Sequence, residues 1–306
     1  MENIFKGISN WIIFIRERFP LNEHIPFILV FFSCCYLVGN NLNYGYFYFN
    51  VINLSVSLIT VILIFLHLRI FDEIKDLDKD RIIHPNRPLV RGLIKLKHAK
   101  IFVTIIILIE ILLNSFFNLK AIISLILVIS YSFLMYKEFF VKFWITKKVV
   151  LYAFLHAIIM ILIPIYIYLA NFSELKFEYL LFSVCNWFIS NIFEFSRKMF
   201  LDNEEGFEDS YLNQIGYKKT LTIHYILIFT TLYITLFFTF TNLINIFSFS
   251  IFCFTYFLVL SVLTKKEVIN YQSKKNNIIK LSKKTGYLVI ILFYGIIILT
   301  SVVKLI

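Results

Sequence analysis

Long apolar runs, separated by short polar segments, make up most of the chain. Runs of about 20 apolar residues are typical of helices that cross a membrane. The pattern therefore predicts an all-α polytopic membrane protein, with residues 1–306 as a single transmembrane domain. Pro164 is expected to kink the fifth span. The nine predicted spans are Ile25–Val38, Val51–Phe71, Ala99–Phe117, Ala121–Tyr136, Val149–Ala170, Tyr179–Phe200, Leu221–Phe240, Leu243–Leu263 and Tyr287–Val303.

The composition supports this fold class. The chain is 59% hydrophobic and has a mean hydropathy of +0.81, whereas a soluble domain is typically about half apolar. Charged residues make up only 16% of the chain and gather in a few polar segments. These values disfavour the alternative of a soluble helical domain.

The basic residues predict the orientation of the chain. If the spans alternate, all 30 lysines and arginines lie on one side except Lys120, Lys176 and Lys304. An excess of basic residues in short loops marks the cytoplasmic side. We therefore predict a cytoplasmic N-terminus, cytoplasmic loops at 72–97 and 202–219, and the C-terminus on the opposite side. The net charge of +11 then orients the chain and attracts anionic lipid, and no nucleic-acid partner is expected.

The first 20 residues predict an amphipathic helix that lies in the membrane interface. Charged residues interrupt the apolar run, so a cleavable signal peptide is not expected. Pro20 should end the helix. The apolar stripe at helical spacing is formed by Ile4, Phe5, Ile8, Trp11, Ile12 and Ile15.

A dense group of acidic residues follows the second span. Asp72, Glu73, Asp76 and Asp80 recur at spacings that share one helical face, so their oxygens can converge. Converged carboxylates suit Mg²⁺, which usually binds phosphates as well. We therefore predict Glu73, Asp76 and Asp80 as Mg²⁺ ligands. The alternative is a solvated loop of mixed charge, because basic residues alternate with the acids.

Arg87 lies between Pro85 and Pro88, directly after the acidic group. The prolines should end the helix and stiffen the backbone at Arg87. A rigid guanidinium near a metal site can bind phosphate through two hydrogen bonds, and Arg69, just before the acids, is expected to bind the same substrate. The alternative for Arg87 is a loop arginine that contacts lipid phosphate.

Glu110 is a single acid inside the third predicted span. An acid in the membrane interior is a candidate functional residue. The alternative is a neutral structural role, in which Glu110 is protonated or pairs with Asn114 one turn away. His67, one to two turns before the acidic group, is a candidate cavity residue.

The acidic group resembles the aspartate-rich signature of the UbiA superfamily of intramembrane prenyltransferases, NDxxDxxxD. Asp72 takes the Asn place, Glu73 takes the first Asp place, and Asp76 and Asp80 match. The continuation DRIIHPNRPLVRGLI is similar to the DxINxPxRPxxxGxI pattern of the chlorophyll-synthase and archaeal lipid-synthase branches. The resemblance implies a UbiA-like bundle of about nine transmembrane helices around a central cavity.

A second acidic motif of this family resembles the segment NIFEFSRKMFLDNEEGFEDSYLNQIG. Glu194 and Arg197 match the RExxKDxEDxxGD pattern, while Lys198 stands where the family has its leading Asp. Lysine cannot bind Mg²⁺, but it can contact a diphosphate as a point charge. We therefore expect one Mg²⁺, bound at the first motif. One alternative is that the changed second motif weakens or alters the activity. Another is that this segment is an ordinary charged loop. The acids that are out of register are Asp202, Glu204 and Glu205.

The resemblance implies a Mg²⁺-dependent enzyme that moves a prenyl group from a polyprenyl diphosphate to an unidentified small-molecule or lipid acceptor. The alternatives are an intramembrane terpene cyclase of the same fold and, from another class, a cation-coupled transporter. The expected catalytic residues are Asp76, Asp80, Arg87, Arg197 and Lys198. The expected substrate-binding residues are Arg69, Asp72, Arg87, Glu110 and Glu194.

Overall fold

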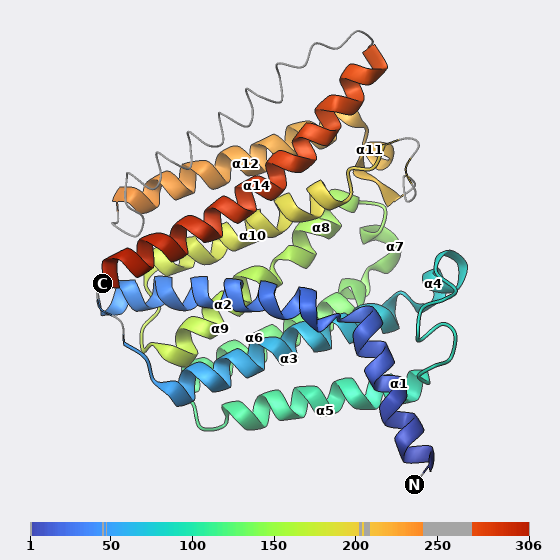
Figure 1. Ribbon diagram of the computed structural model, residues 1–306, viewed down its shortest axis with the longest axis horizontal. Helices are drawn as coiled ribbons and strands as arrows, with labels where there is room; N and C mark the ends of the chain where they lie inside the picture. The colour runs from blue at the N-terminus through green and yellow to red at the C-terminus, as the bar shows by residue number, and fades with distance from the viewer. Residues whose placement is uncertain are drawn as a thin grey trace. The chain divides into compact units, whose positions relative to one another are not determined.

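The computed structural model describes residues 2–44, 46, 48–201, 204, 209–240 and 271–305 (Figure 1). Every regular element in this part of the chain is a helix, which confirms the predicted fold class. Six of the described helices are long and apolar enough to cross a membrane. The long helices are α2 (Leu21–Asn43), α3 (Val51–Lys75), α5 (Leu96–Asn114), α6 (Leu119–Tyr136), α9 (Ile159–Asn171) with α8 (Val149–Ala157), α10 (Phe177–Arg197), α12 (Tyr217–Phe240) and α14 (Tyr271–Leu305).

The predicted spans agree with these helices in position. Leu243–Leu263 lies outside the described residues, so the count of nine stays a prediction. Helices α5 and α10 are not among these six, and both carry polar side chains in their interiors. These side chains, which include Glu110 and Asn114 in α5 and Asn186 and Asn191 in α10, are buried.

The fifth predicted span is interrupted at Ile158, between α8 and α9. Pro164, the expected position of a kink, lies inside helix α9, and the kink stays a prediction.

The chain divides into two compact units. The first unit comprises Met1–Ser33, Phe49–Lys142 and Tyr166–Ser173, and the second comprises Cys34–Tyr48, Phe143–Ile165 and Glu174–Ile306. In the first unit α3, α5 and α6 pack against one another, and in the second unit α10 packs against α8, α12 and α14 (Figure 1). The short elements are α4 (Leu77–Ile83), η1 (Glu138–Phe140), α7 (Lys142–Ile145) and α11 (Tyr211–Gln214).

Helix α1 (Glu2–Arg18) packs on the first unit and ends before Pro20, as predicted. Its buried face differs from the predicted stripe. Phe14 is 1% exposed and belongs to the core cluster of α3 and α5, whereas Ile12 is 47% exposed. Trp11 supports the same face through a ring contact with Phe102 at 4.1 Å between centroids. The helix therefore docks on protein through residues 11, 14 and 15, and the side chains of Ile4, Phe5 and Ile8 lie outside the described residues.

Candidate active site

The first acidic motif continues the helical backbone of α3. Asp76 N–H donates to Asp72 O at 2.9 Å, and Asp80 N–H donates to Asp76 O at 2.8 Å. Asp76 lies between the end of α3 and the start of α4. The hydrogen bonds keep Asp72, Asp76 and Asp80 on successive turns of one face, as the spacing predicted.

Helix α4 ends at Ile83, where the prolines were expected to stop it. His84 leaves the helical conformation, with φ −132° and ψ 64°, because the following Pro85 disfavours helical backbone before it. The chain then turns back through Gly92, whose φ of +74° favours glycine. Before Gly92, the turn in which Arg87 N–H donates to His84 O at 3.1 Å returns Arg87 to the acidic motif.

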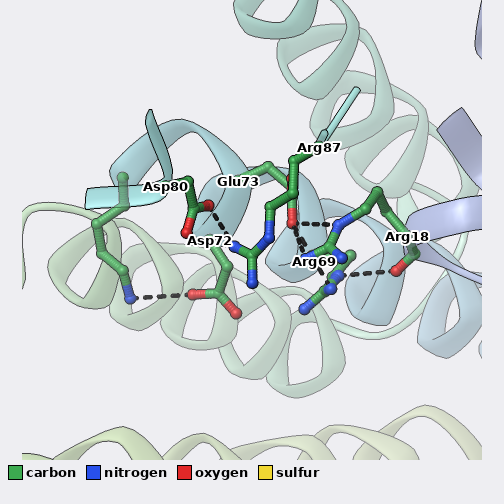
Figure 2. Close-up of polar contacts among 7 residues, drawn as sticks. Arg18, Arg69, Asp72, Glu73, Asp80 and Arg87 are labelled. Carbon is green, nitrogen blue, oxygen red and sulfur yellow. Dashed lines mark hydrogen bonds and ion pairs between the residues drawn. The ribbon is translucent and has the colours of Figure 1, made fainter. Parts of the chain in front are cut away.

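Glu73 is 3% exposed and is held by two arginines (Figure 2). Arg18 places Nη2 2.5 Å and Nε 2.6 Å from Glu73 Oε1, and Arg69 Nη2 lies 3.6 Å from the same oxygen. Arg69 Nε also donates to the carbonyl oxygen of Arg18 at 2.7 Å. Arg18 was not among the predicted site residues. The sequence indicated only that Arg18 lies at the end of the N-terminal helix, two residues before Pro20. Nothing near it in the sequence indicates Glu73 as its partner.

Asp80 is also 3% exposed and forms an ion pair between Oδ2 and Arg87 Nη1 (Figure 2). The predicted phosphate-binding arginine therefore contacts a motif carboxylate. Asp72 is half-buried and pairs with Lys75 Nζ at 3.0 Å. Each of these acids thus has a basic partner within its own unit.

Asp76 is half-buried between these pairs. Burial raises the pKa of its carboxyl above the ordinary value, and the nearby Lys75 opposes this shift only in part. A cation bound beside Asp76 would favour the ionised form.

The predicted convergence of oxygens from Glu73, Asp76 and Asp80 is not seen in this arrangement. Among the described residues, no three His, Cys, Asp or Glu side chains form a group that could hold a metal ion. The physical reason is that guanidinium groups draw Glu73 and Asp80 to separate partners. The assignment of these acids as Mg²⁺ ligands therefore stays a prediction.

The donor set nevertheless fits Mg²⁺. This ion is usually held by one or two carboxylates together with substrate phosphates and water, so a complete protein cage is not required. Both arginines contact Glu73 through Oε1, and Arg87 contacts Asp80 through Oδ2. The second carboxylate oxygens, Glu73 Oε2 and Asp80 Oδ1, take no part in these ion pairs. Together with Asp76, these atoms supply hard oxygen ligands.

A pocket of about 530 Å³ lies beside the motif in the first unit. Arg18 and Arg87 line it together with His84 and Asn86. Glu17 also lines the pocket, but Arg91 holds its carboxylate at 2.7 Å and 3.1 Å. Two arginines, each paired with a motif carboxylate, therefore line one pocket.

The second motif lies in the second unit, at the end of α10. Glu194 Oε2 pairs with Arg197 Nη2 at 2.7 Å, and Glu194 Oε1 pairs with Lys198 Nζ at 2.8 Å. Both carboxylate oxygens are thus occupied by cations, and the group carries one excess positive charge. This charge suits an anion better than a metal ion.

The chain beyond α10 folds back to hold Lys198. Ser210 Oγ donates to Lys198 O at 2.9 Å, and the ring of Tyr211 stacks on Phe195 at 4.3 Å. Burial, followed by the charge of Glu194, raises the pKa of the Tyr211 hydroxyl, which keeps it protonated. Glu204 accepts a hydrogen bond from Leu201 N at 2.9 Å. Asp202 and Glu205 lie outside the described residues.

Glu110 belongs to a buried network rather than to the pocket. His67 Nδ1 lies 2.7 Å from Glu110 Oε1, and both side chains are 0% exposed. The expected partner Asn114 does not bind this carboxylate: its Nδ2 donates to Glu110 O and to Thr60 Oγ1. A substrate-binding role for Glu110 stays a prediction.

The structure brings the predicted site residues together in two groups, one in each unit. Arg69, Asp72, Glu73, Asp76, Asp80 and Arg87 form the first group, and Glu194, Arg197 and Lys198 form the second. Glu110 lies in the first unit, but its contacts are with His67 and not with the acidic motif.

Comparison with solved structures shows the fold. The chain is 17% identical to a digeranylgeranylglyceryl phosphate synthase, with a TM-score of 0.66 over 94% of this chain and 98% of that chain. It is 16% identical to a UbiA homolog from Aeropyrum pernix K1, with a TM-score of 0.60 over 90% and 96% of the two chains. A UbiA homolog from Archaeoglobus fulgidus bound to DMAPP and Mg²⁺ is 14% identical, with a TM-score of 0.56 over 88% and 98%.

Comparison at the level of sequence shows the family. No curated protein sequence matched the chain significantly. The sequence profile of the UbiA prenyltransferase family matches residues 28–300, a range that includes both motifs, α3 to α10 and most of α14. The chain therefore belongs to the UbiA prenyltransferase family.

Proposed function

We propose that this protein is a Mg²⁺-dependent intramembrane prenyltransferase that moves a prenyl group from a polyprenyl diphosphate to a small-molecule or lipid acceptor. The observation that carries the proposal is the pair of buried motif carboxylates, Glu73 and Asp80, with arginine partners at the end of an apolar helix. Family membership and the Archaeoglobus fulgidus homolog bound to DMAPP and Mg²⁺ support it.

The first motif would hold the metal ion. Glu73, Asp76 and Asp80 are the proposed ligands, and Asp72 assists through its charge. When bound, Mg²⁺ would neutralise the negative charge that develops on the diphosphate as the carbon–oxygen bond breaks. Burial of Glu73 and Asp80 excludes water from the ligands and strengthens their electrostatic interactions.

Fixed cations of the chain complete the binding of the leaving group. Arg87 and Arg69 in the first unit are proposed to donate hydrogen bonds to phosphate oxygens, and Arg18 joins them because it shares a pocket with Arg87. In the second unit Arg197 and Lys198 are proposed to bind the diphosphate directly, with Glu194 orienting both. These groups stabilise the leaving group most when its charge is largest.

The membrane orientation is also a proposal. The asymmetry of lysines and arginines supports a cytoplasmic N-terminus and cytoplasmic motif loops. In vesicles of known sidedness, an impermeant maleimide should label Lys79→Cys from the cytoplasmic face and Lys120→Cys from the other face. Labelling of both from one face would overturn the orientation.

A mass-spectrometric screen tests the activity. Purified protein in nanodiscs would be incubated with prenyl diphosphates of different lengths and with aromatic acids, quinone precursors, tetrapyrroles and glycerol phosphate lipids as acceptors. We expect a prenylated acceptor with Mg²⁺ and none after EDTA treatment. Turnover that survives EDTA would contradict the mechanism, and a cyclic hydrocarbon released without acceptor would indicate a terpene cyclase instead.

A further inference from the structure

We infer that Arg18 and Arg87 couple Mg²⁺ binding to diphosphate binding. Each guanidinium neutralises a carboxylate that the proposed function assigns to the metal, so Mg²⁺ binds strongly only when a diphosphate draws the guanidinium away. The inference rests on the proposed function and adds a role for the arginines before any bond breaks: they prevent the metal from binding alone.

The charges of the first motif are balanced. Glu73 contacts Arg18 and Arg69, Asp80 contacts Arg87 and Asp72 contacts Lys75. With Asp76 as the fourth acid, four carboxylates face four basic groups. Adding a divalent cation alone to this region creates an excess of positive charge in a setting where charges are poorly screened. Adding a diphosphate alone creates an excess of negative charge. Adding both restores the balance, so each ligand favours the other.

The geometry gives the diphosphate access to the arginines. The side chains of Glu73 and Asp80 are only 2% and 5% exposed, whereas those of Arg18 and Arg87 are 16% and 24% exposed. Both arginines line the same pocket of about 530 Å³. Glu73 and Asp80 do not line this pocket, so an anion in it would meet the two arginines before it meets these carboxylates.

The backbone at Arg18 is fixed, so the exchange needs only side-chain motion. The carbonyl oxygen of Arg18 accepts a hydrogen bond from Arg69 Nε at 2.7 Å. The neighbouring Phe19 is 2% exposed. Arginine has a long flexible stem, so its guanidinium can leave Glu73 while α1 stays in place.

Metal binding in the absence of diphosphate tests the inference. Mn²⁺ binding would be measured by electron paramagnetic resonance on the full-length protein in nanodiscs of zwitterionic lipid. We expect Arg18→Gln and Arg87→Gln each to lower the Mn²⁺ dissociation constant by about fivefold or more, the lower end of typical coupling between two ligands. Arg18→Lys, which keeps the charge, should bind Mn²⁺ as weakly as the wild type.

Arg81→Gln is the matched control. Arg81 lies on α4 but pairs with Asp78, whose side chain is 90% exposed, and it does not line the pocket, so its removal should leave Mn²⁺ affinity unchanged. An unchanged or weaker Mn²⁺ affinity in both Arg18→Gln and Arg87→Gln would overturn the inference, because the arginines would then orient the carboxylates for the metal. The two variants break separate ion pairs, so each tests the coupling if the other fails to fold.

The result is separable from the proposed function. The inferred coupling is wrong if both glutamine variants bind Mn²⁺ no more tightly than the wild type while the wild type still transfers prenyl groups with Mg²⁺. The proposed function fails if no donor and acceptor react with Mg²⁺, whatever the Mn²⁺ affinities of the variants are.

Discussion

His67 Nδ1 lies 2.7 Å from Glu110 Oε1, and neither side chain is exposed. This contact joins α3 to α5 inside the first unit. Next to it, Asn114 Nδ2 donates to Thr60 Oγ1 at 2.9 Å and Tyr166 OH donates to Asn114 Oδ1 at 2.6 Å. Polar groups in an apolar interior must satisfy one another, so the network fixes how α3, α5 and α9 pack.

Glu110→Ala should therefore destabilise the protein. Removing one partner of a buried ionisable pair typically costs about 3–5 kcal/mol, because the other partner is left buried and alone. Thermal unfolding in detergent would measure the loss, with Ile109→Ala as a control because Ile109 is 40% exposed. Equal stability of Glu110→Ala and Ile109→Ala would show that the network is not structural.

Gly286→Ala should weaken helix packing in the second unit. A Cβ at Gly286 would lie 1.9 Å from Ser196 Oγ and 2.8 Å from His224 Cε1. The serine hydroxyl can rotate away, but the buried His224 ring cannot easily move, and overpacking of this kind costs about 1–3 kcal/mol.

Gly295→Ala provides the matched control for that measurement. Gly295 lies on the same helix, α14, and a Cβ there would meet nothing within 4 Å. Thermal unfolding should show a lower midpoint for Gly286→Ala and an unchanged or higher midpoint for Gly295→Ala, since alanine favours helix. Equal midpoints would contradict the close approach of the helices.

Asp80→Asn should remove most of the activity. The change keeps the shape of the side chain but removes the charge proposed to bind Mg²⁺, and the loss of such a group lowers turnover by about 100-fold or more. Asp78→Asn is the matched control, because Asp78 lies on the same short helix and its side chain is 90% exposed. Comparable turnover of the two variants would exclude Asp80 as a metal ligand.

Lys198→Ala should weaken the binding of the donor. A lost hydrogen bond to a charged group is worth about 1.5–3 kcal/mol, or roughly 10- to 100-fold in affinity. Titration with a non-hydrolysable prenyl diphosphate analogue would measure the effect, and Lys219→Ala, at an exposed position of α12, should have none. Similar affinities for both variants would remove Lys198 from the proposed site.

The periodic features of the fold were predictable from the sequence. Long apolar runs predicted the helices, and the spacing of Asp72, Asp76 and Asp80 predicted their common face. Pro85 predicted the end of α4, because proline restricts the residue before it. These features depend on local geometry, which a sequence displays directly.

The partners of the site residues were not predictable in the same way. Arg18 and Glu73 are separated by 55 residues, and His67 and Glu110 by 43. A helical period indicates which face a residue occupies, but it does not indicate which distant side chain meets that face. The same limit explains why Phe14 was missed: its burial depends on Ile70, Phe71 and Ala99, which belong to later helices.

The docking of α1 has a consequence for biosynthesis. Its partners are translated later. Glu73 follows its partner Arg18 by 55 residues, and Leu93, whose carbonyl oxygen accepts a hydrogen bond from Asn10, follows Asn10 by 83 residues. Nascent α1 therefore cannot complete its packing until α3 and the loop after α4 have been translated. Helix α1 is thus synthesised before the partners that hold it and reaches its native position only after they are made.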